Sequence, residues 1–431
     1  MNRTHTDKGS RRDFFKQASA LAGLFSFGTC TASGTEENKP LIILRSGWQT
    51  VNIGDVAHTP GVLHLLQQYI PEAQVVLFPS DIDSAVERML TQNFSNLKIV
   101  YGKTDADGNP ATPELQDIFK RADLFLHGSG PGIFSINVMR AWVENFKKPF
   151  GIYGTTVSDV GDALKSLLAQ ADFVFCRETH SVANLKQAKV EEPTIGFAPD
   201  GTFAFHLLDD DRALPFLQEN ALEEKKFICA VPRLRYTPYH QFKKVNWSQK
   251  EIDRKMAVNE KYQEIDHAKM RDAIIAWVRE TGLKVLVCPE MTYQLDIIHP
   301  LVIDPLPDDV KQNVVARKTF WLPDEAASVY KRAHAVISME CHSPIIAAAQ
   351  RTPFFYLRQP EDTIKGQMYY DIGLSDWVFE IDDRSGTEIA SALMNIYQDY
   401  DAATAKLAKA MKYVRELHEN TMQVVRKSLA I

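Results

Sequence analysis

The chain has 431 residues, with 49 Lys and Arg against 55 Asp and Glu, so its formal net charge is -6. This weak acidity argues against the basic surface of nucleic-acid-binding proteins, and no nucleic-acid partner is expected. The length exceeds that of one ordinary domain and predicts two. Five cysteines are too few for a disulfide-stapled scaffold.

The first residues differ in composition from the rest of the chain. Arg11 and Arg12 precede two Phe and a Lys, and an apolar run of 11 residues then ends at Gly28. That run is too short to span a bilayer as a helix. Segment 1–32 therefore resembles a bacterial twin-arginine signal peptide, with a polar linker at 33–40.

This resemblance implies recognition by the twin-arginine export machinery and a periplasmic or extracellular location. Two alternatives remain open. Cys30 is a candidate for acylation, which would anchor the exported protein to a membrane, although the residues before it match a lipoprotein signal poorly. The segment also fits a basic amphipathic N-terminal helix.

From residue 41, short apolar runs alternate with longer amphipathic ones, a pattern typical of parallel βαβ units. We predict an α/β fold with two Rossmann-like domains. The first domain covers 41–206, with strands at 41–44, 74–78, 123–126, 150–154 and 173–176, and helices at 60–69, 82–90, 139–146, 163–170 and 179–187.

A charged stretch between 206 and 226 marks the predicted domain boundary. The second domain covers 226–385, and a helical tail covers 386–431. Segment 233–262 is rich in aromatic residues and lysines, so it is either a lid or acceptor loop or a solvated excursion. The second domain has predicted strands at 227–231, 284–288, 335–338 and 353–357, and helices at 266–281, 324–332 and 344–350.

Two loops of the first domain follow strands, where α/β sheets bind ligands. Asn52 and Asp55 flank a glycine and can bond to backbone groups; the alternative is a turn with a helix N-cap. Gly128, Ser129 and Gly130 form a glycine-rich loop whose N–H groups can cradle a phosphate or carboxylate; the alternative is a tight turn. Neither loop matches a nucleotide-binding fingerprint.

Two further strand ends carry chemically capable side chains. Arg177 can fork onto a carboxylate or phosphate, or form a salt bridge with Glu178 or another neighbour. His342 can act as an acid or base, with Glu340 as a group that orients it. On an extended segment Cys341 points away from His342, so a Cys–His nucleophile is disfavoured. No His/Asp cluster has metal-ligand spacing, so neither a metal nor a cofactor is predicted.

These loops, in this order, resemble the polysaccharide pyruvyl transferase family. The family has two domains in a glycosyltransferase-B-like (GT-B-like) arrangement with the site between them. Its members transfer a pyruvyl group from phosphoenolpyruvate to a sugar, leaving a ketal and phosphate. The matching pieces are 52–55, 123–130, 151–154, 176–185, 198–203, 338–350, 365–366 and 371–374.

The resemblance implies an enzyme that takes phosphoenolpyruvate or a similar anionic donor and a cell-envelope glycan as acceptor. His342 is the implied catalytic residue, acting in donor binding or proton transfer. The implied donor-binding residues are Arg177, Gly128, Ser129, Gly130, Asn52 and Asp55. The alternatives are another glycan-modifying transferase on the same fold, and a non-catalytic exported glycan-binding protein.

The chain departs from the family pattern just before the histidine. The family has an arginine, an apolar residue and then histidine, whereas here Glu340 and Cys341 precede His342. A carboxylate at this position is expected to repel an anionic donor, so a substitute cation is required; Arg351 and Arg358 are the nearest candidates.

Overall fold

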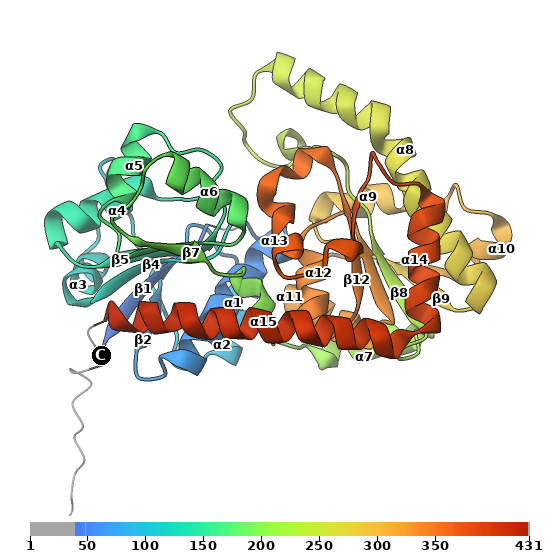
Figure 1. Cartoon of the computed structure of the whole chain (residues 1–431), viewed down its shortest axis with the longest axis horizontal. Helices are drawn as coiled ribbons and strands as arrows, with labels where there is room; N and C mark the ends of the chain where they lie inside the picture. Colours follow the sequence, from blue (N-terminus) through green and yellow to red (C-terminus); the bar gives the residue numbers. More distant parts are fainter. Residues whose placement is uncertain (1–38, 48, 430–431) are drawn as a thin grey trace, which may run out of the picture. The chain divides into compact units, whose positions relative to one another are not determined.

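The computed structural model describes residues 39–47 and 49–429, which contain two parallel β-sheets (Figure 1). The predicted signal peptide and most of the predicted linker lie outside these residues. The strands are β1 Leu41–Arg45, β2 Gln74–Leu77, β3 Lys98–Ile99, β4 Leu124–His127, β5 Phe150–Thr155, β6 Phe173–Cys176 and β7 Thr194–Phe197 in one sheet, and β8 Phe227–Val231, β9 Lys284–Val287, β10 Val314–Ala316, β11 Ala335–Ser338, β12 Phe354–Arg358 and β13 Val378–Glu380 in the other.

The strand orders are those of doubly wound sheets. They run β3-β2-β1-β4-β5-β6-β7 and β10-β9-β8-β11-β12-β13, so the chain reverses direction across each sheet between β1 and β4 and between β8 and β11. Ligands of such folds bind beyond the carboxyl ends of the strands at these points. The predicted α/β fold with two Rossmann-like sheets is confirmed.

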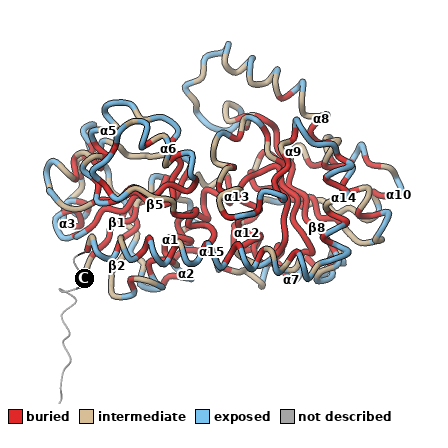
Figure 2. The backbone as a smooth tube through the Cα atoms, in the orientation of Figure 1, coloured by how far each residue is buried: buried red, intermediate tan, exposed pale blue. Residues whose placement is uncertain are grey.

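The central strands are buried throughout, as Figure 2 shows in red. Helices cover both faces of a parallel sheet, so its strands need continuous apolar runs rather than alternation. The main α-helices are α1 Ile53–Tyr69, α2 Ser84–Asn93, α3 Pro113–Arg121, α4 Ile136–Ala141, α5 Asp162–Leu168 and α6 Thr179–Gln187, then α7 Asp210–Glu219, α8 Gln249–Thr281, α11 Pro323–Arg332, α12 His342–Ala349, α13 Gln367–Asp371, α14 Gly386–Gln398 and α15 Tyr400–Lys427.

Two helices begin at least seven residues earlier than the sequence predicted. Helix α1 starts at Ile53 rather than Pro60, because the side chain of Asn52 caps its first turn. Helix α8 starts at Gln249 after the N-cap Ser248, so the second half of segment 233–262 is helical. The long α8 and α14 pack against each other.

The C-terminal helix α15 returns to the first sheet (Figure 1). The hydroxyl of Thr421 lies 3.0 Å from the hydroxyl of Tyr153 on β5, and His418 Nε2 donates to the carbonyl of Pro199 at 3.1 Å. The tail predicted at 386–431 thus consists of α14 and α15. No helix in residues 39–47 and 49–429 combines the length and apolar character needed to cross a membrane.

Candidate functional site

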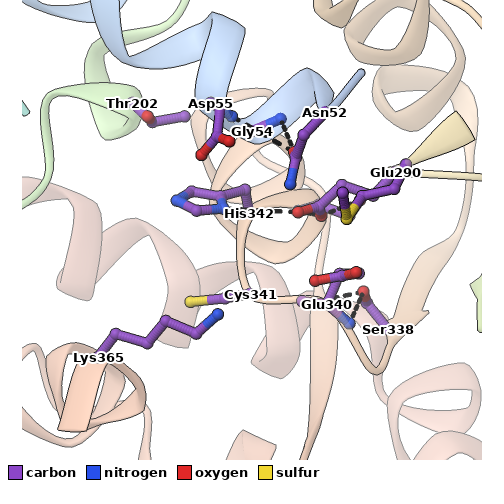
Figure 3. A network of polar contacts seen from close by, with 12 residues as sticks. Asn52, Gly54, Asp55, Thr202, Glu290, Ser338, Glu340, Cys341, His342 and Lys365 are labelled. Atoms are coloured by element: carbon purple, nitrogen blue, oxygen red, sulfur yellow. Dashed lines mark hydrogen bonds and ion pairs between the residues drawn. The ribbon is translucent and has the colours of Figure 1, made fainter. Parts of the chain in front are cut away.

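The centre of the site is His342, the first residue of α12 and only 4% exposed. Its Nδ1 lies 3.5 Å from Oε1 of Glu290, in the loop after β9. The other oxygen of Glu290 accepts from the N–H and hydroxyl of Ser343 at 2.6 and 2.7 Å. Figure 3 shows the ring between the first turn of α1 and this carboxylate. Glu290, rather than the expected Glu340, therefore orients His342.

Burial controls the charge of this pair. It lowers the pKa of His342, although Glu290 opposes the shift. Burial alone would raise the pKa of Glu290, but its contacts with His342 and Ser343 outweigh that effect and lower it. The geometry therefore places an ionised carboxylate beside a histidine that gives up its proton readily.

The loop at 52–55 makes room for this histidine. Asn52 Oδ1 accepts from the N–H groups of Gly54 and Asp55 at 2.7 and 3.3 Å, which is the N-cap role. A Cβ on Gly54 would lie 2.4 Å from the Cβ and Cγ atoms of His342. The N–H of Ile53 donates to the carbonyl of Glu290 at 3.0 Å. The start of α1 is thus tied directly to the loop that holds Glu290.

A second histidine, which the sequence did not single out, faces His342. His58 lies one helical turn after Gly54 on the same face of α1 and is fully buried. The ring centroids of His58 and His342 are 4.8 Å apart and the planes meet at 88°. His58 Nδ1 lies 3.0 Å from Oδ1 of Asp200. The signal in the sequence that could have identified His58 is its spacing of four residues from Gly54, which places both on one face of a helix.

Asp200 links this histidine to Arg177. Its Oδ2 accepts from Arg177 Nη1 at 2.8 Å, and its Oδ1 accepts from the N–H of Thr202 at 2.9 Å. Burial alone would raise the pKa of Asp200, but His58 and Arg177 lower it well below its usual value. Asp200 is therefore an ionised carboxylate in the interior, stabilised by charged partners.

The guanidinium of Arg177 is completely buried. Besides Asp200, it donates from Nε to the hydroxyl of Thr156 at 2.7 Å and lies 3.9 Å from Glu178. This matches the salt-bridge alternative for Arg177. One atom remains available, because Nη2 has no hydrogen-bond partner among the described residues.

The glycine-rich loop packs tightly behind Asp200. Ser129 is buried, and its hydroxyl accepts from the N–H of Gly201 at 2.9 Å. A Cβ on Gly128 would lie 2.4 Å from Oγ of Ser46. The carbonyl of Gly130 accepts from the N–H of Thr156 at 3.2 Å. The loop thus holds the neighbouring strand ends together.

A buried arginine from the loop after β8 lies beside Glu340. Arg233 Nε lies 3.4 Å from Oε2 of Glu340, and Gln294 donates to Oε1 of Glu340 at 2.7 Å. Burial raises the pKa of Glu340 to about 8, although Arg233 opposes the shift. The raised pKa reduces the negative charge on Glu340 near neutral pH, and with it the repulsion expected towards an anionic donor.

Neither predicted substitute takes this position. Arg358 is the last residue of β12 and pairs with Glu380 at 2.7 Å. Arg351 follows α12 on an exposed turn. A lysine from the matched piece 365–366 does approach the site. Lys365 Nζ lies 3.2 Å from Oδ1 of Asp362, a carboxylate that also pairs with Arg233.

Cys341 belongs to a helical turn rather than an extended segment, with φ of -81° and ψ of -30°. It is fully buried, and burial raises the pKa of its thiol to about 12. A thiol with so little thiolate at neutral pH is a poor nucleophile. Cys341 is therefore disfavoured as a nucleophile, as predicted. The reason is the burial of its thiol, since the backbone is not extended as the prediction assumed.

Three residues of this cluster meet the geometric requirement for holding a metal ion. His58, Asp200 and His342 each offer a ligand atom, all within 4.8 Å of one another. The fold brings them together from distant positions, which the sequence spacing did not reveal. Asp200 is already engaged by His58, Thr202 and Arg177, and the guanidinium 2.8 Å away opposes a further cation.

Comparisons with known proteins agree with this geometry. The family model described as polysaccharide pyruvyl transferase matches residues 52–359. No curated protein sequence matches the chain. Among solved structures, UDP-N-acetylglucosamine 2-epimerase from Rickettsia bellii aligns with a TM-score of 0.54 and 9% identity, covering 91% of this chain and 97% of that one.

Anabaena Alr3699/HepE in complex with UDP-glucose aligns with a TM-score of 0.56 and 10% identity, covering 90% of this chain and 100% of that one. UDP-GlcNAc 2-epimerase from Neisseria meningitidis aligns with a TM-score of 0.52 and 10% identity, covering 88% and 99%. At these identities the similarity shows the fold, a pair of Rossmann-like domains in a GT-B-like arrangement.

Proposed function

We propose that this chain, which belongs to the polysaccharide pyruvyl transferase family, transfers a pyruvyl group from phosphoenolpyruvate to a sugar of a cell-envelope polysaccharide. Family membership makes it a glycan-modifying transferase on a GT-B-like fold. The donor, the acceptor and the exported location are the parts that we propose.

One observation carries the proposal: unsatisfied nitrogen atoms cluster around Asp200. His58 Nε2, Arg177 Nη2 and His342 Nε2 are buried and have no partner among the described residues. Buried polar atoms are nearly always satisfied, so such a cluster calls for a bound group. Phosphoenolpyruvate carries a carboxylate and a phosphate, whose oxygens can accept from Arg177 Nη2, and its transfer to a sugar needs groups that exchange protons, as the two imidazole Nε2 atoms can.

The second domain supplies further charge for the same donor. Arg233 and Lys365 flank Glu340, whose pKa burial raises to about 8. Guanidinium and ammonium groups stabilise the negative charge that develops on a leaving phosphate. We propose that these two cations bind the phosphate, while Arg177 binds the carboxylate of the donor and His342 acts in proton transfer.

The test is to incubate purified protein with phosphoenolpyruvate and extracted envelope glycans while phosphate release is measured. Calorimetry with phosphoenolpyruvate alone measures donor binding. Phosphate release that requires the glycan supports the proposal. Absence of both release and binding contradicts it. UDP-glucose belongs in the same thermal-shift panel, because a structural neighbour was solved with it and only a true ligand raises the unfolding temperature.

A further inference from the structure

The two facing histidines are held in the same way. Each has its Nδ1 beside a carboxylate, at 3.0 Å between His58 and Asp200 and at 3.5 Å between His342 and Glu290. Each has an Nε2 that is buried and unpartnered within the described residues. A carboxylate at Nδ1 fixes the tautomer and leaves Nε2 free to exchange a proton, which is how catalytic imidazoles are usually oriented.

Because the two rings are so close, both imidazoles are not protonated at the same time. With centroids 4.8 Å apart, two protonated imidazoles repel each other inside the protein. Asp200 is the closer of the two carboxylates and is firmly ionised, so it can stabilise a positive charge that forms on His58 during the reaction. Burial lowers the pKa of His342, which favours its neutral form. One ring is thus suited to donate a proton and the other to accept one.

We propose that His58 is a second catalytic residue of this site and exchanges protons with the substrates in alternation with His342. The inference rests on the proposed function, because forming a pyruvyl ketal through two histidines requires four proton transfers. Two acceptor hydroxyls each lose one, C3 of the donor gains one, and the departing phosphate gains one.

In the first step, His58 Nε2 protonates C3, and the π electron pair of the donor forms the new C–H bond. The oxygen of the first hydroxyl bonds to C2 and its proton passes to His342 Nε2. In the second step, the bond from C2 to the phosphate oxygen breaks and the electron pair leaves with phosphate, which is protonated by His342. The second hydroxyl then bonds to C2 and returns a proton to His58. Both histidines regain their starting states.

The groups that face the pair come from several elements. Asp200 and Arg177 act on His58 from the loop before the short helix Gly201–Ala204 and from the end of β6. Glu290 acts on His342 from the loop after β9, and Figure 3 shows Asp55 of α1 above the ring. The dependence of kcat on pH is therefore compared between variants that keep all four of these charged side chains.

The test compares kcat against pH for wild-type protein and for His58→Asn and His342→Asn. General acid–base catalysis contributes about 10²- to 10⁴-fold, so we expect losses of that size in each variant. His58→Asn should also abolish the decrease in kcat at alkaline pH. His342→Asn should abolish the decrease at acidic pH. Affinity for phosphoenolpyruvate should stay within about threefold in His58→Asn, because the lost interaction acts on turnover. His64→Asn, on the same helix beside His206, is the matched control and should retain wild-type turnover.

The inference is overturned if His58→Asn keeps the alkaline fall or most of its turnover. If wild-type protein releases no phosphate from phosphoenolpyruvate, the proposed function fails separately. The histidine pair is then tested by ¹⁵N NMR of histidine-labelled protein. One protonated and one neutral imidazole, with the titration of His58 altered by His342→Asn, support the pair. Two independent titrations overturn it.

Discussion

The imidazoles of His58 and His342 meet edge to face, 4.8 Å apart, although one comes from α1 and the other from α12. Each ring is held at Nδ1 by its own carboxylate. The contact brings the two Rossmann-like sheets together at the carboxyl ends of their strands, where doubly wound sheets place ligands. A site assembled in this way depends on the close approach of α1 and α12.

Gly54 is the residue that permits this approach. In Gly54→Ala, the new Cβ would lie 2.4 Å from the Cβ of His342, so the ring or the helix must shift. We expect a loss of about 1–3 kcal/mol in the free energy of unfolding, as for other overpacked cores. Urea denaturation measures it. Gly132→Ala, whose Cβ would meet nothing within 4 Å, is the control. Equal stability of both variants would contradict the close contact.

Arg177 should be important for stability as well as for donor binding. Its removal in Arg177→Met leaves Asp200 ionised in the interior with one fewer charged partner. Breaking a buried ion pair from one side costs about 3–5 kcal/mol. Arg121→Met removes an exposed guanidinium, 3.2 Å from Asp117, and should be neutral in the same denaturation experiment. Comparable effects of the two substitutions would show that Arg177 is not charge-paired in solution.

Glu340 should make stability depend on pH in a defined direction. Its pKa is raised to about 8 in the folded protein, so the unfolded chain releases this proton at lower pH. Stability is therefore greatest below the unfolded pKa and falls as the pH rises towards 8. In Glu340→Gln the side chain stays neutral. As the pH rises across this window, the unfolding free energy of the variant should increase relative to that of wild type by up to about 1.4 kcal/mol per pH unit. A constant difference would show that Glu340 is ionised in the fold.

Arg233 should replace the arginine that the family places before its histidine. We expect Arg233→Met to weaken phosphoenolpyruvate binding by about 10- to 100-fold, since a charge-assisted contact contributes roughly 1.5–3 kcal/mol. Calorimetry measures the affinity. Arg279→Met is the control, because Arg279 pairs with Asp309 at 2.9 Å on the surface. Equal weakening of binding in both variants would contradict this assignment.

The paired arginines at the N-terminus should control export. Replacing both Arg11 and Arg12 by Lys keeps the charge but removes the recognised pair. We expect the variant to accumulate in the cytoplasm while wild-type protein reaches the periplasm or the medium. Fractionation followed by immunodetection measures the distribution. Replacing Arg3 by Lys, outside the motif, should leave it unchanged. Identical distribution of the double variant and wild type would contradict twin-arginine export.

Much of the fold could be predicted because buried parallel strands require uninterrupted apolar sequences. Runs such as those of β6 and β8 are fully buried and match their predicted bounds. The missed elements are those without this signal. Strand β3 has two residues, one of them Lys98, and β7 contains Gly196 and is only partly buried. The start of α1 was misplaced because most of its faces are buried, which leaves no clear amphipathic period.

The sequence by itself determined which loops matter, because the alternation of strands and helices places every strand's carboxyl end on the ligand side. It thereby singled out Arg177 and His342. The tertiary structure alone decided their partners: Asp200 for Arg177, and Glu290 and His58 for His342. It also decided that burial raises the pKa of Glu340. Charge states and pairings of buried groups depend on which distant segments are packed together, and no local pattern encodes that packing.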